Sequence, residues 1–244
     1  MMDVRIYENS MELGAHAADL IADKLTEAIK EKGCARIILS TGASQFDMFK
    51  YLVKKEVEWE KVTMFHLDEY IGLPETHSAS FRKYLHERFA DILPVTAHFV
   101  NTDGDIEKNL AELTEELRKD VIDVGVIGIG ENGHIAFNDP PADFDTREAY
   151  KIVDLDEKCR MQQVGEGWFA SLEDTPAQAV SMTPYQIMQC KCIVSVVPDG
   201  RKAEAIKKTL EADEVTNMIP ATFVKTHPEW YLYLEKESAA FLEK

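Results

Sequence analysis

The chain has 244 residues, of which 45% are hydrophobic, and its formal net charge is −17, with 27 Lys and Arg against 44 Asp and Glu. This length is enough to bury a full core, and we expect a single domain over residues 1–244. The strong negative charge excludes nucleic acid and anionic membrane surfaces as partners, because both would be repelled. An anionic small molecule is compatible only if cationic side chains or backbone N–H groups gather locally against this field.

The cysteines and the N-terminus bear on the cellular compartment. The four cysteines form no CxxC pair and have no metal-type spacing with histidines, so we expect no metal site and a reducing compartment. No stretch approaches the apolar length that spans a bilayer, and the N-terminus MMDVRIYENS lacks a signal-peptide pattern. The sequence therefore predicts a cytoplasmic protein.

Short apolar runs alternate with longer amphipathic ones, which is typical of parallel strands joined by crossover helices. The sequence predicts helices over 11–32, 44–54, 106–119 and 201–212, and strands that begin at 35 or span 62–70, 123–130 and 192–198. In the first helix Leu13, Ala17 and Leu20 recur at helical spacing, and Gly33 then ends it. This order predicts an α/β fold with an open, mostly parallel, Rossmann-like sheet that helices cover on both faces.

Polar and glycine-containing segments follow four of the predicted strands. They are STGASQ (40–45), LDEY (67–70), GIGENGH (128–134) and PDGRK (198–202). Ligands of such sheets bind at the carboxyl ends of the strands. The four segments should therefore meet at one edge of the sheet and form the site.

Two of these segments are candidates for phosphate binding. In STGASQ, backbone N–H groups with the Thr41 and Ser44 hydroxyls could hold a phosphate at the start of a helix. The alternative is a plain N-cap in which Gly42 eases the turn. In PDGRK, Arg201 and Lys202 enter a helix at its N-terminus, where cations oppose the helix dipole unless an anion lies nearby. The alternative is that both side chains extend into water.

The LDEY segment places two carboxylates, Asp68 and Glu69, at the end of an otherwise apolar strand. Partial desolvation there raises the pKa of a carboxyl group toward the range of a general base. Successive residues of an extended chain point to opposite sides, so only one of the pair should face a given site. The alternative is that one or both carboxylates cap the next helix or stay solvated.

The segment GIGENGHIAFNDPP carries His134 in a tight turn after an apolar strand, with Asn132 before it and Asp139 after it. Histidine is the side chain best suited to moving protons near neutral pH, and a flanking Asn or Asp can fix its tautomer and orientation. The alternatives are local turn roles, left-handed for Asn132 and preceding proline for Asp139. The placement predicts a proton-transfer role for His134.

The segments STGASQ, FHLDEYIGLPETHSASFRKYL, GIGENGHIAFNDP and PDGRKAEAIKKTLE, in this order, resemble the glucosamine-6-phosphate deaminase (isomerase) family over most of the chain. The patterns LDEYxGLP and GxNGHIAFN are specific, whereas STGASQ is a looser match. The related 6-phosphogluconolactonases share the fold, but they typically have GHTASLFP where this chain has GHIAFND, and they lack the DEYxGLP form. The contrast favours a deaminase.

The resemblance implies conversion of an amino-sugar 6-phosphate and water to a ketose 6-phosphate and ammonia, without a metal or organic cofactor. His134 would move a proton during opening of the sugar ring, and Asp68 would take the proton from C2. Asn132 and Asp139 would support His134. The phosphate anchor that the resemblance implies comprises Thr41, Gly42, Ala43, Ser44 and Lys202.

Four features depart from the usual family pattern. Asn132 stands where the family often has Asp, and Asp139 stands where it usually has Glu, one methylene longer. The phosphate loop reads TGAS where TGGT followed by Pro is usual. An arginine that many members carry aligns with Gly167, so part of the phosphate grip is lost or is supplied by Arg160 or Arg201.

Other functions stay open on sequence grounds. The alternatives are a galactosamine-6-phosphate isomerase, a 6-phosphogluconolactonase and a non-catalytic sugar-phosphate-sensing module. A sensing module could lose the acid/base residues and would usually bring a DNA-binding segment, whereas this chain retains Asp68 and His134 and shows no basic helix-turn-helix segment before the fold. The expected partner is a small sugar phosphate, with no nucleic acid and no membrane, and a homo-oligomer is compatible with the sequence.

Overall fold

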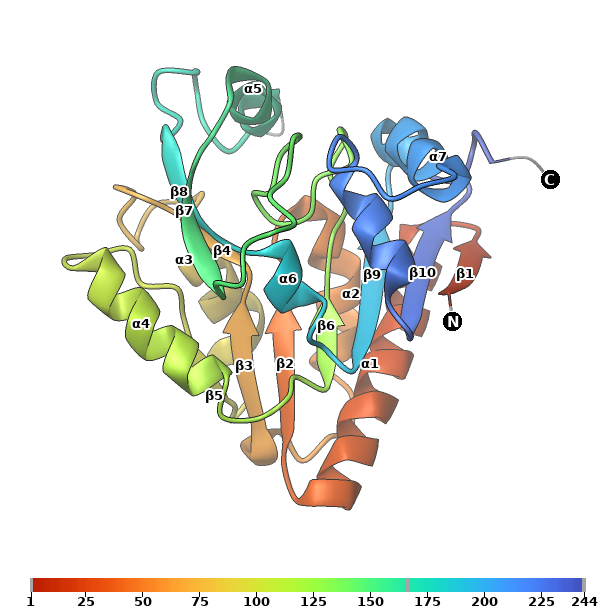
Figure 1. The fold of residues 1–244 in the computed structure, drawn as a ribbon. Helices are drawn as coiled ribbons and strands as arrows, with labels where there is room; N and C mark the ends of the chain where they lie inside the picture. Colours follow the sequence, from red (N-terminus) through yellow and green to blue (C-terminus); the bar gives the residue numbers. More distant parts are fainter. Residues whose placement is uncertain (1, 166, 243–244) are drawn as a thin grey trace.

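The computed structural model describes residues 2–165 and 167–242, and within them two β-sheets organise the chain (Figure 1). The central sheet has seven strands in the order β1-β10-β9-β6-β2-β3-β5, and all its neighbouring pairs are parallel. The smaller sheet has the order β4-β8-β7 and is antiparallel. The strands are β1 (Met2–Tyr7), β2 (Ala35–Leu39), β3 (Val62–His66), β4 (Asp68–Tyr70), β5 (Thr96–His98), β6 (Val124–Val126), β7 (Tyr150–Asp154), β8 (Gln178–Met182), β9 (Cys192–Val197) and β10 (Trp230–Glu235).

The four predicted helices correspond to α1, α2, α4 and α7 and begin and end close to the expected positions, whereas α3, α5 and α6 were not predicted. In α1, Asn9 Oδ1 accepts a hydrogen bond from the Glu12 N–H at one end, and Gly33, in a left-handed conformation, ends the helix at the other. The α-helices are α1 (Ser10–Lys32), α2 (Phe46–Leu52), α3 (Phe81–Leu85), α4 (Ile106–Leu117), α5 (Glu157–Gly165), α6 (Pro184–Ile187) and α7 (Ala203–Glu211). Single 3₁₀ turns at Ala43–Gln45 and Gly200–Lys202 lead into α2 and α7.

Alternate residues of the central strands pack on opposite faces of the sheet. Ile37 and Leu39 of β2 belong to the core cluster that contains the apolar residues of α1 and α2. Ile38, between them, belongs to the cluster that contains apolar residues of α4 and α7. Because both faces are buried under helices, the strands are apolar throughout rather than alternating, as parallel sheets require. The predicted α/β fold is confirmed.

The predicted strand over 62–70 is wrong in one respect, because the chain changes sheets within it. β3 ends at His66, and β4 begins at Asp68 in the smaller sheet, where it pairs with β8. Leu67 lies at the change, and its carbonyl accepts a hydrogen bond of 2.6 Å from the Met182 N–H. The Tyr150 hydroxyl, on β7, donates to the His66 carbonyl at 3.0 Å. These contacts join the two sheets, and an apolar run cannot signal such a change because both strands are buried.

The strand predicted over 123–130 is shorter than expected, since β6 covers only Val124–Val126 and the rest is an irregular segment. The sequence patterns did not predict β1, β10 or the smaller sheet. None of the helices in residues 2–165 and 167–242 is long and apolar enough to cross a membrane. The single domain over residues 1–244 stays a prediction.

A close approach of α1 to α2 yields a test of the packing. A Cβ atom added at Gly14 would lie 2.7 Å from the Met48 backbone nitrogen and 2.8 Å from the Asp47 carbonyl carbon. Backbone atoms cannot move aside as a flexible side chain can, so the added methyl group should lower the free energy of unfolding by ~1–3 kcal/mol. This loss should exceed the ~1 kcal/mol by which alanine stabilises a helix relative to glycine. We expect Gly14→Ala to lower the denaturant midpoint of unfolding, whereas Asp23→Ala, on the exposed face of α1, should not. Equal or greater stability of Gly14→Ala would contradict this packing.

Candidate active site

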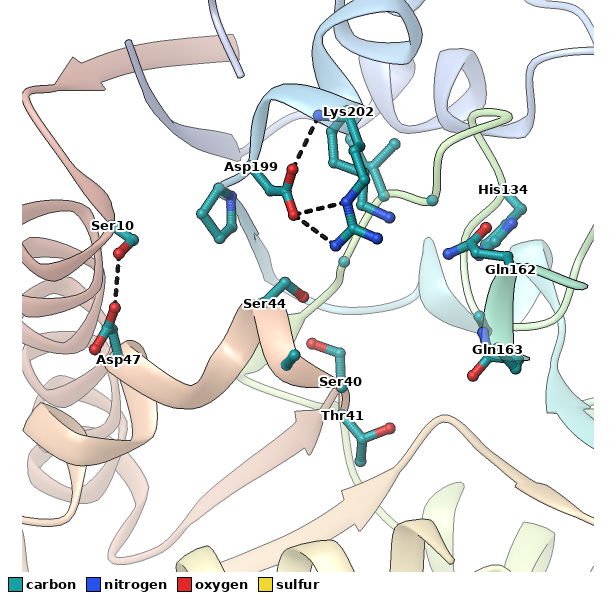
Figure 2. Close-up of a pocket in the computed structure, with 18 of the residues that line it drawn as sticks. Ser10, Ser40, Thr41, Ser44, Asp47, His134, Gln162, Gln163, Asp199 and Lys202 are labelled. Carbon is teal, nitrogen blue, oxygen red and sulfur yellow. Dashed lines mark hydrogen bonds and ion pairs between the residues drawn. The ribbon is translucent and has the colours of Figure 1, made fainter. Parts of the chain in front are cut away.

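The carboxyl ends of four strands surround one cavity of ≈ 500 Å³. β3 lies on one side of β2 and β6 on the other, so the chain order reverses between β2 and β6, which is where such folds bind ligands. Segments that follow β2, β3, β6 and β9 all contribute to the lining, as the sequence predicts. Figure 2 shows Thr41 and Ser44 in the lower part of the view, Lys202 above them next to Asp199, and His134 on the right. The predicted site residues that line the cavity are Thr41, Gly42, Ala43, Ser44, Asp68, His134 and Lys202.

Asp68 lies at the first position of β4, directly after the change of sheet. Its side chain is buried, with 7% of the residue exposed, yet it contributes to the wall of the cavity. Burial, and next the negative charge of Glu69, hold the pKa of Asp68 well above its usual range. A carboxylate in this environment is a stronger base than one in water, which suits proton abstraction from carbon.

Glu69 faces away from the cavity and has a structural role. Its carboxylate accepts hydrogen bonds from the Ser80 hydroxyl at 2.8 Å and from the backbone N–H of Arg82 at 2.9 Å and of Phe81 at 3.2 Å. Burial raises the pKa of Glu69, and these hydrogen bonds oppose the rise. Glu69 thus caps the start of α3, and only Asp68 of the pair lines the cavity, as the alternation of side chains predicts.

A compact turn holds His134. The Gly130 N–H donates to the His134 carbonyl at 2.9 Å, and the His134 N–H donates to Asn132 Oδ1 at 3.0 Å. The imidazole lies directly over Gly130, because a Cβ atom added there would be 2.2 Å from ring atoms Cε1 and Nε2. Glycine at position 130 therefore provides the space that the ring occupies.

Asp139 stands behind His134 rather than in the cavity wall. Its Oδ1 lies 3.1 Å from His134 Nδ1 and accepts a hydrogen bond of 2.9 Å from the Asn132 amide. The contact with the ring is close but does not have the alignment of a regular hydrogen bond. Burial raises the pKa of Asp139, but His134, Asn132 and Cys159 together outweigh it and lower the pKa to about 2. Asp139 is therefore ionised at neutral pH, and the shorter side chain still reaches the histidine.

The loop over 40–45 and the segment that carries Lys202 form the opposite wall. Gly42 has a φ of 95°, and its carbonyl accepts a hydrogen bond of 2.8 Å from the Tyr84 hydroxyl. The Gln45 amide, fully buried, donates to Ser44 Oγ at 2.9 Å and to the Val196 carbonyl at 3.0 Å, which ties the loop to β9. Lys202 is only 6% exposed. The wall thus combines hydroxyl groups, a backbone turn and a buried cation.

The two arginines considered as replacements for the missing family arginine differ in position. Arg160 Nη2 donates to the carbonyls of Leu172 and Thr175, and Arg160 does not line the cavity. Arg201 does line it, and Asp199 holds its guanidinium with hydrogen bonds of 2.6 and 2.9 Å (Figure 2). Of the two, Arg201 is placed to act on a ligand.

Sequence reasoning missed one wall of the cavity. Gln162 and Gln163, on α5, and Trp168 after it line the site, and Figure 2 shows both glutamines on the side of His134. Gln163 is held in place because its Oε1 accepts a hydrogen bond of 2.9 Å from the Tyr70 hydroxyl. The adjacent amides were the one available signal, but nothing in the local pattern indicates that α5 reaches the site. Among residues 2–165 and 167–242, no group of three or more His, Cys, Asp or Glu side chains could hold a metal ion.

Comparison with known proteins agrees with this geometry. The chain is 32% identical to a glucosamine-6-phosphate deaminase of Streptococcus sanguinis over 97% of both chains, and 33% identical to one of Lacticaseibacillus paracasei over the whole of both. Among solved structures it resembles a monomeric glucosamine-6-phosphate deaminase, at a TM-score of 0.89 and 27% identity, over 98% of this chain and 99% of that one. A 6-phosphogluconolactonase of Thermotoga maritima shares the fold, with a TM-score of 0.80 and 17% sequence identity, over 97% of this chain and 100% of that one. Since the family profile described as glucosamine-6-phosphate isomerases/6-phosphogluconolactonase matches residues 8–232, the chain belongs to this family.

Proposed function

We propose that the protein is an amino-sugar-phosphate deaminase that converts glucosamine 6-phosphate and water to fructose 6-phosphate and ammonia. One observation carries the proposal: Asp68 and His134 line the same cavity as the Thr41–Ser44 loop and Lys202. An acid/base pair and a cationic, hydroxyl-rich wall are what an enolising enzyme for a phosphorylated sugar needs. The full-length relatives named glucosamine-6-phosphate deaminase support the choice of substrate.

The phosphate binds at the wall that carries Lys202. Thr41 and Ser44 supply hydroxyl donors, the turn at Gly42 and Ala43 supplies backbone N–H groups, and Lys202 supplies charge. Because Lys202 is buried, its attraction for phosphate is screened less by water than that of a surface lysine would be. These contacts with the phosphate place the sugar across the cavity, toward His134 and Asp68.

His134 acts first, by moving a proton between the ring oxygen and the C1 hydroxyl so that the sugar ring opens. Asp139, ionised and in contact with Nδ1, orients the imidazole. Asn132 links the two through its amide and the His134 backbone. Asn132 and Asp139 are therefore positioning residues in this proposal.

Asp68 then takes the proton from C2, which forms an enolamine. Protonation at C1 converts the enolamine to an imine at C2. Water adds to the imine carbon, the C–N bond breaks, and ammonia leaves with the ketose phosphate as the other product. The reaction consumes one water per sugar and is a hydrolysis at the C–N bond.

We extend the proposal to the cellular setting. The four cysteines are free thiols, which supports a reducing compartment such as the cytoplasm. The proposed substrate would place the protein in amino-sugar catabolism, with N-acetylglucosamine as the sugar's wider source. The net charge of −17 supports the absence of nucleic-acid and membrane partners. A homo-oligomer stays a prediction, to be measured by sedimentation; one structural relative is a monomeric glucosamine-6-phosphate deaminase.

The substrate is tested by measuring ammonia release from glucosamine 6-phosphate and galactosamine 6-phosphate side by side, with hydrolysis of 6-phosphogluconolactone as a third assay. We expect ammonia release with glucosamine 6-phosphate at the higher kcat/KM. A preference for the galactose epimer would identify the isomerase alternative, and lactone hydrolysis without ammonia release would identify a lactonase. Activity on none of the three would overturn the enzyme assignment in favour of a sensing module.

Asp68→Asn tests the base. We expect kcat to fall about 10²–10⁴-fold, because the amide cannot accept the C2 proton.

The same variant tests the effect of Asp68 on stability. Since the pKa of Asp68 is raised in the folded protein, the stability it contributes is present below its unfolded pKa and is lost as pH rises through the folded value. The inactive variant should therefore unfold at a higher temperature than the wild type at neutral pH, with the difference shrinking in acid. Full activity would remove Asp68 from the mechanism.

Gly130→Ala tests the space under the imidazole. The added methyl group would occupy the position of the ring, so His134 must move, and a displacement of about 1 Å should lower kcat about 10²-fold. Gly165→Ala is the control, because Gly165 does not line the cavity and a Cβ atom there would meet nothing within 4 Å. If both variants retained the same activity, the close packing of His134 on Gly130 would be irrelevant to catalysis.

A further inference from the structure

Glu131 brings a negative charge to the cations at the proposed phosphate site. It lies in the turn between Gly130 and Asn132, and its Oε1 is 3.5 Å from Arg201 Nη1 and 3.7 Å from Lys202 Nζ. Oε1 is buried and accepts no hydrogen bond from the described residues. Asp199, by contrast, holds Arg201 at hydrogen-bonding distance. Glu131 is therefore near enough to neutralise both cations but is bound firmly to neither.

The two cations already face two carboxylates before any ligand binds. Arg201 and Lys202 contribute two positive charges, and Asp199 and Glu131 contribute two negative ones. A sugar phosphate carries between one and two negative charges at neutral pH. A phosphate beside Lys202 would thus face the Glu131 carboxylate at short range, and like charges in a partly buried site repel strongly.

The Glu131 side chain can rotate away from the two cations, whereas that of Asp199 cannot easily do so. Asp199 begins the turn into α7, and its Oδ1 accepts from the Arg201 N–H at 2.9 Å while its own N–H donates to Glu235. The Glu131 side chain is 34% exposed, so solvent lies beside it. A rotation of this side chain toward water removes the repulsion without breaking a hydrogen bond of Oε1.

We propose that Glu131 competes with the substrate phosphate for Lys202 and Arg201, and that its withdrawal into solvent is part of substrate binding. Glu131 thereby sets the affinity for the phosphate group and holds the cation pair in place while the cavity is empty. This inference rests on the phosphate position in the proposed function. It assigns to Glu131 an effect on binding and not on the proton transfers.

The test is the dissociation constant of inorganic phosphate, measured by calorimetry without turnover. Glu131→Gln removes the charge and keeps the shape, so we expect phosphate to bind about tenfold more tightly. Glu131→Asp, which draws the charge back from both cations, should shift binding in the same direction by less. Glu107→Gln, at an exposed position in α4, changes the net charge equally and should leave the constant unaltered. Unchanged or weaker phosphate binding in Glu131→Gln would overturn the proposal.

Two further measurements separate this proposal from the proposed function. In a Lys202→Gln background, Glu131→Gln should tighten phosphate binding much less than in the wild type, and an undiminished gain would show that Glu131 acts elsewhere. With glucosamine 6-phosphate, KM should fall in Glu131→Gln while kcat changes less. Tighter phosphate binding without ammonia release would support the role of Glu131 and reject the deaminase, whereas ammonia release with unaltered phosphate binding would do the reverse.

Discussion

The buried carboxylate of Glu69 fixes the part of the chain on which the site depends. Its hydrogen bonds join β4 to the start of α3, and they reach Ser80, Phe81 and Arg82 across the interval that separates these residues from the strand. A buried acceptor with several donors stabilises one backbone position, because its loss would leave each donor unsatisfied at about 1–3 kcal/mol. With Glu69 held on one side of the strand, the pleat turns Asp68 to the other side, into the cavity.

The two adjacent carboxylates therefore differ in their surroundings, and only Asp68 lines the cavity. Hydrogen-bond donors surround Glu69 and offset part of the rise in its pKa that burial causes, whereas burial and the neighbouring charge of Glu69 both raise the pKa of Asp68. The hydrogen bonds to Glu69 stabilise β4 and thereby hold Asp68 in this unfavourable environment. A buried acid that the surroundings leave uncompensated is a common feature of catalytic sites, since the same effect that destabilises the charge strengthens the base.

The parts of the structure that follow from local chemistry were predictable from the sequence. Amphipathic spacing and Gly33 locate α1, and the polar segments after the strands locate the loops that meet at the cavity. The rest depends on long-range pairing. The break at Leu67 arises because β4 pairs with β8, more than a hundred residues later, and no local signal in an apolar run distinguishes one sheet from another. For the same reason Gln162 and Gln163 were missed, since α5 reaches the cavity only through the smaller sheet beside it.

The spacing of residues around His134 explains how a shorter carboxylate can serve. Asp139 approaches Nδ1 only because the turn from Gly130 to His134 is closed by backbone hydrogen bonds and by Asn132, which contacts both Asp139 and the His134 backbone. The amide of Asn132 donates to the carboxylate, which an aspartate at this position could not do when ionised. The Asn132 amide thus holds the Asp139 carboxylate beside the ring, and His134, with Asn132 and Cys159, lowers the pKa of Asp139 to about 2, so that its charge persists beside the histidine.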